Sequence, residues 1–438
     1  MKTNRRPAWM AAYLTGAICF TATAATVQPS WDLPPSQLKE GVFWQEHWYE
    51  REPVPGTTRR LRINAPETSL GRFGDRTEAR ENGLMIIEVN ENLFQITGAE
   101  LYAELWGGHP GTANKRVSIN GRSTYQLPRF GTEDGHCTFS YPVVKLPVTD
   151  LVNGRNAVQW AVDLGTTFWG HAMVDQACLR LALTNGHPRL LEQGLESFSA
   201  RLIARPNETA TSEGINLVLD VGESLRGRIE SVAFQGWYFG YDDNGDLRQR
   251  DWHGFTHDRR PAAHLGTAEG GSVAINWDTH LLPAQKGVAA RALVRFKDAP
   301  GLVYLTPAVT DLVIPDRERA VVHLHETFDA PVPFWSRAGN RKTCTIVLDV
   351  DPARIEEAEL QVTTWTGGAG GVKEYFTING VHHPVAEGHS HDRQFNRMPI
   401  DPKILKKGIN TIELLSDTEH HGIEILHPGP ALMIRVRR

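Results

Sequence analysis

The chain has 438 residues, of which 40% are hydrophobic and 22% are charged, and both fractions are ordinary for globular proteins. A chain of this length is expected to form two to four domains, each with its own core. The net charge of −5 and the pI of about 6.4 argue against a nucleic-acid-binding surface, which needs a basic patch or stripe.

The first 25 residues have the pattern of a signal peptide. Lys2, Arg5 and Arg6 form a positively charged start, and the apolar stretch at 8–20 is too short to span a bilayer. The Ala-Thr-Ala sequence at 22–24 fits the small-residue rule for cleavage. We therefore expect a secreted or periplasmic protein. We expect no integral membrane segment in the remainder of the chain, because no later stretch is long and apolar enough.

Two distant segments resemble each other. Residues 99–121 and 358–380 align without gaps and share nine identities in 23 positions, where chance gives only about one or two. Trp106 matches Trp365, and each lies 14 residues before an asparagine that is followed by glycine. The parallel continues toward the end of each segment. The chain is therefore expected to contain two diverged copies of one domain, at 30–190 and at 320–438.

Each copy has the local pattern of a β-sandwich. An alternating strand ends in Asn120-Gly121 or in Asn379-Gly380, and Asn-Gly favours a type I′ hairpin because both residues tolerate positive φ. A Gly-x-Asn motif follows at 154–156 and at 408–410, before an apolar strand. These residues are expected to form turns rather than to perform chemistry.

This order of motifs resembles the galactose-binding-like jelly-roll domains, such as the sugar-binding domain of beta-galactosidase-like enzymes. Those domains have a strand ending in Asn-Gly, then a leucine-containing segment (Leu151 and Leu405 here), a Gly-x-Asn and a long apolar strand. The resemblance covers less than half of the chain. It implies a jelly-roll β-sandwich, and its motifs specify fold better than function, because such domains bind sugars, bind other ligands or brace an enzyme.

The segment between the copies has a different pattern. Residues 205–214 are polar and are expected to form a linker. Turn-separated strand patterns after it favour an immunoglobulin-like sandwich over 205–316; they lie at 215–221, 229–234, 273–277, 288–296 and 302–305. The chain is thus predicted to be all-β, with two jelly-roll-like β-sandwiches separated by an immunoglobulin-like β-sandwich.

Two parts of this middle segment are predicted to be loops. Asp242, Asn244 and Asp246 alternate along the chain, and three such oxygen donors suit Ca²⁺. The motif lacks a glutamate at the twelfth position, and an exposed turn explains the same residues equally well. Residues 251–264 mix histidine, aspartate, arginine and aromatic residues with little strand pattern, so they form either a binding loop or a solvated one.

Histidines are concentrated in the last copy, where seven of the 18 lie in the final 57 residues. His389 and His391 alternate, so both imidazoles can face one ligand or one transition metal. We predict that His421 approaches them across a concave surface, with Asp392 and Glu424 nearby. The first copy has no equivalent of this motif. The alternative is a polar loop in which histidines have accumulated.

Export would place the three cysteines of the mature chain in an oxidising environment. Cys137 and Cys178 fall in the same copy and are predicted to form a disulfide, which leaves Cys344 unpaired. The alternative is three buried free thiols.

Familiar catalytic motifs are missing: there is no Gly-x-Ser-x-Gly, no phosphate-binding glycine loop and no His-Glu-x-x-His. The leading interpretation is a secreted, non-catalytic carbohydrate-binding or surface-interaction protein whose partner is a carbohydrate or a cell-surface polymer. One alternative is an extracellular polysaccharide-active hydrolase or lyase with a histidine-rich site in the third domain. Another is a structural envelope protein.

Overall fold

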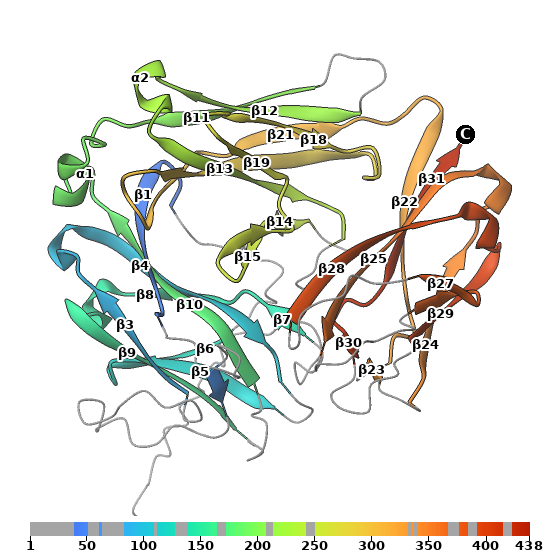
Figure 1. Cartoon of the computed structure of the whole chain (residues 1–438), viewed down its shortest axis with the longest axis horizontal. Helices are drawn as coiled ribbons and strands as arrows, with labels where there is room; N and C mark the ends of the chain where they lie inside the picture. Colours follow the sequence, from blue (N-terminus) through green and yellow to red (C-terminus); the bar gives the residue numbers. More distant parts are fainter. Residues whose placement is uncertain are drawn as a thin grey trace, which may run out of the picture.

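The computed structural model confirms an all-β protein (Figure 1). Its two described α-helices are short, α1 (Pro188–Glu192) and α2 (Glu223–Arg226). The structure describes residues 39–50, 61–63, 83–108, 112–127, 138–163, 172–206, 213–241, 250–331, 334–336, 340–366, 376–383, 392–414 and 423–438. The predicted signal peptide lies outside these ranges. Within them, no helix is long and apolar enough to span a membrane.

The first sandwich consists of two antiparallel sheets whose apolar side chains face each other. One sheet has the order β1-β10-β4, with β7 and β8 on the far edge of β4 and β2 paired to β10; the other has the order β3-β9-β5-β6. The strands are β1 (Val42–Trp48), β2 (Leu61–Ile63), β3 (Leu84–Val89), β4 (Ile96–Trp106), β5 (Ala113–Ile119), β6 (Ser123–Gln126), β7 (Phe139–Ser140), β8 (Val143–Leu146), β9 (Gly154–Asp163) and β10 (Ala172–Leu183).

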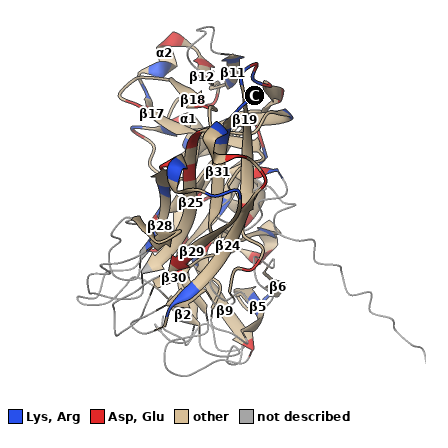
Figure 2. Cartoon of the chain, turned by 90° about the vertical axis from the view of Figure 1, so that its right-hand side faces the viewer, with Lys and Arg blue, Asp and Glu red and all other residues tan. Residues whose placement is uncertain are grey.

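The last sandwich repeats this topology strand by strand. Its sheets have the orders β22-β31-β25-β28 and β24-β29-β26-β27, and β30 and β23 extend the first sheet. Figure 2 looks onto this sandwich and shows acidic and basic residues interspersed along its strands. The strands are β22 (Ala320–Glu326), β23 (Trp335–Ser336), β24 (Lys342–Leu348), β25 (Ile355–Thr366), β26 (Phe376–Ile378), β27 (Val381–His383), β28 (Asp392–Ile400), β29 (Gly408–Leu414), β30 (Ile423–Ile425) and β31 (Ala431–Arg437).

The repeated asparagines explain why both copies fold alike. Asn120 has φ 51° in its turn and donates to the carbonyl of the next 3₁₀ turn (2.8 Å) and to Asn156 Oδ1 (2.9 Å). Asn379 also has φ 51° and makes the same two bonds, at 2.8 Å and to Asn410 at 2.9 Å. Buried amides linked in this way fix the hairpin against the neighbouring strand. The prediction that these asparagines serve the fold is confirmed.

Six of the middle strands continue the large sheet of the first sandwich. β1 pairs with β10 on one edge and with β20 on the other, which produces one 12-stranded sheet. The additional strands of this sheet are β13 (Ile229–Tyr238), β14 (Asp251–His253), β17 (Gly266–Glu269), β19 (Gln285–Phe296), β20 (Leu302–Leu305) and β21 (Val309–Ile314). A second layer contains β11 (Ala200–Pro206), β12 (Gly214–Val221) and β18 (Ala274–Asp278). One apolar core runs through both regions.

Two local predictions differ from the structure. The predicted linker at 205–214 overlaps the end of β11 and the start of β12, because these strands pair over their full described length. The predicted loop at 251–264 contains β14 and the hairpin β15 (Phe255–His257) to β16 (Arg260–Ala262). Its strands are held by tertiary contacts, which a strand pattern in the sequence does not reveal.

The predicted disulfide is wrong. Cys178 is a buried free thiol on β10, next to the ion pairs of Arg180 and Glu46 that hold this part of the sheet together. Burial, followed by the nearby Glu46 carboxylate, raises the pKa of the Cys178 thiol well above its ordinary value. Cys137 lies outside the described residues.

Candidate functional sites

The structure reaches only part of the residues predicted to bind ligand or metal. Glu424 is described in full, on β30, and Asp392 is described as the first residue of β28 without its side chain. The remaining predicted site residues lie outside the described ranges: Asp242, Asn244 and Asp246 of the calcium motif, and His389, His391 and His421 of the histidine cluster.

Glu424 lies at the contact between the first and last sandwiches. Its side chain is buried, with 4% of the residue exposed, and Trp106 Nε1 donates to its Oε2 over 3.0 Å. The indole of Trp106 stacks on that of Trp365, with centroids 6.0 Å apart and planes inclined by 25°. The two tryptophans that match in sequence therefore face each other across the contact, and they belong to this contact in addition to their own sandwiches.

Trp365 is the centre of a row across three strands. Its backbone is opposite Arg393 on β28 and opposite Glu424 on β30. The buried Arg393 guanidinium lies 4.8 Å from the ring centroid of Phe139 and 5.2 Å from that of Tyr141, both in the first sandwich. Cation–π contacts of this kind gain strength when they are desolvated. We call this contact, formed by these residues together with Trp106, the aromatic seam.

The end of β25 lies between the first residues of β28 and β30. Thr366 is opposite Asp392 on one side and opposite Ile423 on the other. Adjacent strands are about 4.8 Å apart, so the first residues of β28 and β30 are about 10 Å apart. His391 directly precedes Asp392, and His421 precedes Ile423 by two residues. Two of the predicted histidines thus belong to segments that join the sheet at the same end.

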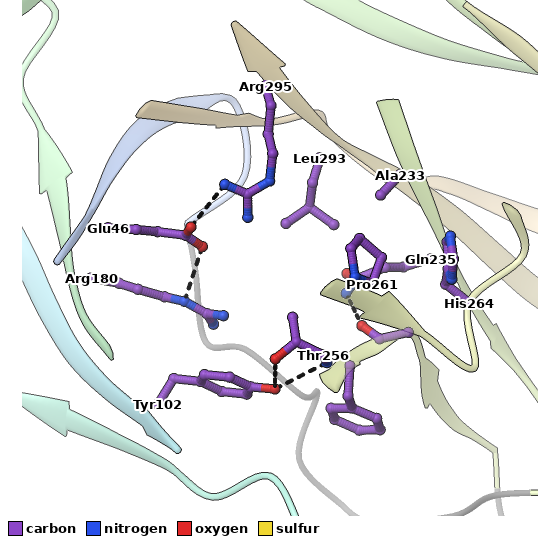
Figure 3. Close-up of a pocket in the computed structure, with 12 residues that line it drawn as sticks. Glu46, Tyr102, Arg180, Ala233, Gln235, Thr256, Pro261, His264, Leu293 and Arg295 are labelled. Carbon is purple, nitrogen blue, oxygen red and sulfur yellow. Dashed lines mark hydrogen bonds and ion pairs between the residues drawn. The ribbon is translucent and has the colours of Figure 1, made fainter. Parts of the chain in front are cut away.

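A second polar region lies on the covered face of the 12-stranded sheet. Glu46, Arg180 and Glu100 are cross-strand neighbours on β1, β10 and β4. Arg180 is 3.6 Å from Glu46 and 3.3 Å from Glu100, and Arg295 donates to Glu46 over 2.9 Å. Burial opposes ionisation of Glu46, but Arg295 and Arg180 outweigh it and hold its pKa below the ordinary value. We call this network of four residues the charge ladder, and Figure 3 shows its members Glu46, Arg180 and Arg295.

A small cavity separates the charge ladder from the hairpin β15–β16. Its volume is about 40 Å³, and its walls include Glu46, Arg180, Gln235 and His264 (Figure 3). The hairpin is attached through Thr256, whose Oγ1 lies 2.8 Å from Tyr102 Oη. This volume has room for a few water molecules, whereas a sugar-sized ligand needs several hundred cubic ångströms. A sugar-sized ligand therefore does not fit into this cavity.

The tip of this hairpin is held by the buried carboxylate of Glu104. The backbone N–H groups of Asp258 and Arg259 donate to it over 3.0 and 3.1 Å, and Thr256 Oγ1 donates over 2.6 Å. Asp258 and Arg259 have φ of 46° and 67°, a costly conformation for residues other than glycine. Burial raises the pKa of Glu104 despite these donors. The carboxylate thus stabilises a strained turn that no Asn-Gly signal marks in the sequence.

A histidine pair also faces a buried carboxylate in the first sandwich. His47 Nε2 lies 3.9 Å from Glu91 Oε1, and His187 Nε2 lies 3.6 Å from Glu91 Oε2. Burial, and then the charge of Arg189, lower the pKa of His47 to about 4 and also lower that of His187. Within the described part of the chain, no group of three or more His, Cys, Asp or Glu side chains is arranged to hold a metal ion.

Comparison with known proteins assigns no family. No protein-family profile matches the sequence, and no curated protein is similar to it. Among solved structures, the chain is similar to a beta-porphyranase of glycoside hydrolase family 86 from Bacteroides plebeius, with 11% identity and a TM-score of 0.24 over 55% of this chain and 37% of that one. It is also similar to the ANX1 ectodomain from Arabidopsis thaliana, with 10% identity and a TM-score of 0.18 over 82% of each chain.

A further glycoside hydrolase family 86 structure, solved in complex with neoagarooctaose, has 13% identity and a TM-score of 0.24 and covers 54% of this chain. The present chain spans about a third of the length of these hydrolases. At such identities and TM-scores the similarities carry neither a family nor an activity over to this protein.

Proposed function

We propose that the protein is exported and binds a carbohydrate or a cell-surface polymer without transforming it. Asp392 and Ile423, which come directly after the two histidine-bearing stretches of the sequence, lie on either side of Thr366 at one end of the sheet, and this placement carries the proposal. Loops held by a rigid sheet are the usual position for a binding site. Imidazoles both donate and accept hydrogen bonds, which suits ligands rich in hydroxyl groups. His389, His391 and His421, with Asp392, are the residues that would contact the ligand.

The role of Glu424 changes in this proposal. Its carboxylate accepts the Trp106 indole N–H in a buried position, so it would support the base of the site rather than touch the ligand. Two further buried carboxylates are also engaged in structural contacts, Glu46 with two arginines and Glu104 with the hairpin tip. Glycoside hydrolysis requires a carboxylate pair that faces the substrate across a cleft. These three groups instead face protein partners, so we do not propose any of them as a member of such a pair.

The experiment that tests this proposal is a glycan array with the mature protein, followed by product analysis on every glycan that binds. We expect specific binding, which His391→Ala combined with His421→Ala abolishes while the melting temperature stays the same. His323→Ala, which removes an exposed histidine elsewhere in the same sandwich, is the matched control and should bind like the wild type. Release of shortened or unsaturated sugars would contradict the proposal and show that the protein is a hydrolase or a lyase. Failure to bind any glycan would favour a structural role.

A further inference from the structure

The edge strand of the last sandwich carries a second, separate pair of histidines. His323 and His325 alternate on β22, which is the outermost strand of its sheet. Residues two apart on a strand point to the same face, and the two imidazole centroids are 6.0 Å apart with planes inclined by 48°. His323 is exposed and His325 is half-buried. The pair therefore lies at the rim of the sheet, where a small ligand can reach it.

One ring nitrogen of His325 is buried and unpaired. Its Nε2 has no hydrogen-bond partner among the described residues. A buried nitrogen without a partner is costly, and a bound metal ion would supply the partner that this imidazole lacks.

The first sandwich provides an internal comparison. Tyr102 and Gln361 occupy the same position in the ungapped alignment. In the first sandwich the strand pairing leads from Tyr102 through Cys178 to Trp48, and in the last it leads from Gln361 through Ala431 to Glu326. His47, one residue before Trp48, is therefore equivalent to His325. In both residues Nε2 is buried and has no hydrogen-bond partner among the described residues. The histidine therefore belongs to the common fold.

The neighbouring position differs between the copies. Gln45 stands in the first sandwich where the last has His323, and its amide donates to the carbonyls of Glu46 and Pro300 over 3.3 and 3.4 Å. His47 Nε2 faces the Glu91 carboxylate, whereas His325 has His323 beside it. The second imidazole is therefore a feature of the last sandwich alone, next to a histidine that both copies share.

We propose that His323 and His325 form a binding site for a divalent transition metal such as Zn²⁺, Ni²⁺ or Cu²⁺, which imidazole ligands suit. A metal bonded to an imidazole nitrogen at 2.0–2.1 Å lies about 3.2 Å from the ring centroid. Two rings bound to one ion are therefore at most about 6.4 Å apart between centroids, and the observed 6.0 Å falls within that reach. Water completes the coordination, and the charge of Asp349, which already acts on His325, favours a cation there.

This proposal does not rest on the proposed carbohydrate binding, and the experiment separates the two. The full mature chain with His389, His391 and His421 all changed to alanine serves as the background, so that the other histidine segments cannot contribute. Titration of this protein with Zn²⁺ by calorimetry should show one bound ion per chain. His323→Gln, which installs the residue of the first sandwich, should weaken binding by at least about tenfold with an unchanged melting temperature. His382→Gln, which removes an exposed histidine on β27, should have no effect.

A second measurement does not depend on a substitution. Carbethoxylation of His323, quantified by mass spectrometry, should be suppressed by Zn²⁺ at the concentration that saturates the calorimetric titration. If His323→Gln binds Zn²⁺ like its background, or if Zn²⁺ leaves the modification of His323 unchanged, the site does not exist. Loss of Zn²⁺ binding with intact glycan binding, or the reverse, shows that the two sites are independent.

Discussion

The aromatic seam yields the sharpest stability prediction, a double-mutant cycle between Trp106 and Glu424. Trp106→Phe removes the indole N–H that donates to the buried Glu424 carboxylate over 3.0 Å and keeps an aromatic ring against Trp365. A hydrogen bond to a charged group contributes about 1.5–3 kcal/mol. Glu424→Gln removes the negative charge of the acceptor in this hydrogen bond. We therefore expect Trp106→Phe and Glu424→Gln to be non-additive, with a coupling energy of about 1.5–3 kcal/mol in the free energy of unfolding.

Urea unfolding followed by circular dichroism provides the four free energies of this cycle. The matched control replaces Trp106→Phe with Trp365→Phe, which trims the other ring of the same stack but retains the bond from Trp106 to Glu424. That control cycle should show clearly weaker coupling. A coupling energy below about 0.5 kcal/mol for the Trp106 cycle, the usual limit of additivity, would refute the view that this hydrogen bond holds the two sandwiches together.

Three further predictions concern other parts of the chain. Because His47 has a folded-state pKa of about 4 against an ordinary 6.5, the unfolded state takes up a proton first as the pH falls. Stability should therefore decline from about pH 6.5 to pH 4, and His47→Gln should make this decline shallower in thermal melts. Glu104→Gln should cost about 2–4 kcal/mol in urea unfolding, since it weakens three donors at a strained turn; a cost under 0.5 kcal/mol would contradict this role. If Asp242, Asn244 and Asp246 bind Ca²⁺, EDTA should lower the melting temperature and added Ca²⁺ should restore it; no shift in either direction leaves a surface turn.

The duplicated topology could be predicted from the sequence because its determinants are local and recur. Asn120 and Asn379 form their hairpins with the residue that follows, and the amide of each bonds the asparagine of the Gly-x-Asn motif in its own copy. Alternating apolar residues then place the strands on either side of a common core. Pairing between strands separated by more than a hundred residues has no such local signature, which is why the shared sheet of β1 and β20 was not foreseen.

The candidate sites were predictable only in part, for the same reason. Glu424 was predicted as a group near the ligand, but its role depends on Trp106, 318 positions away in the chain. The hairpin tip at Asp258 and Arg259 depends on Glu104, more than 150 positions away. Neither residue belongs to a motif, and the two turn residues lack the glycine that usually marks positive φ. Sequence patterns can identify such residues only after the contacting element is known.

The stacked tryptophans restrict where a carbohydrate can bind. Trp106 and Trp365 are 1% and 7% exposed, so each ring face that a sugar would need is already covered by protein. Each tryptophan lies at the end of its strand, β4 or β25, and the two sandwiches contact each other through these strand ends. The buried face of the first sheet is likewise closed by the β15–β16 hairpin over a cavity of only about 40 Å³. The proposed carbohydrate ligand would therefore not stack on these two rings or enter this cavity, which is why the proposal places it at the segments that precede β28 and β30.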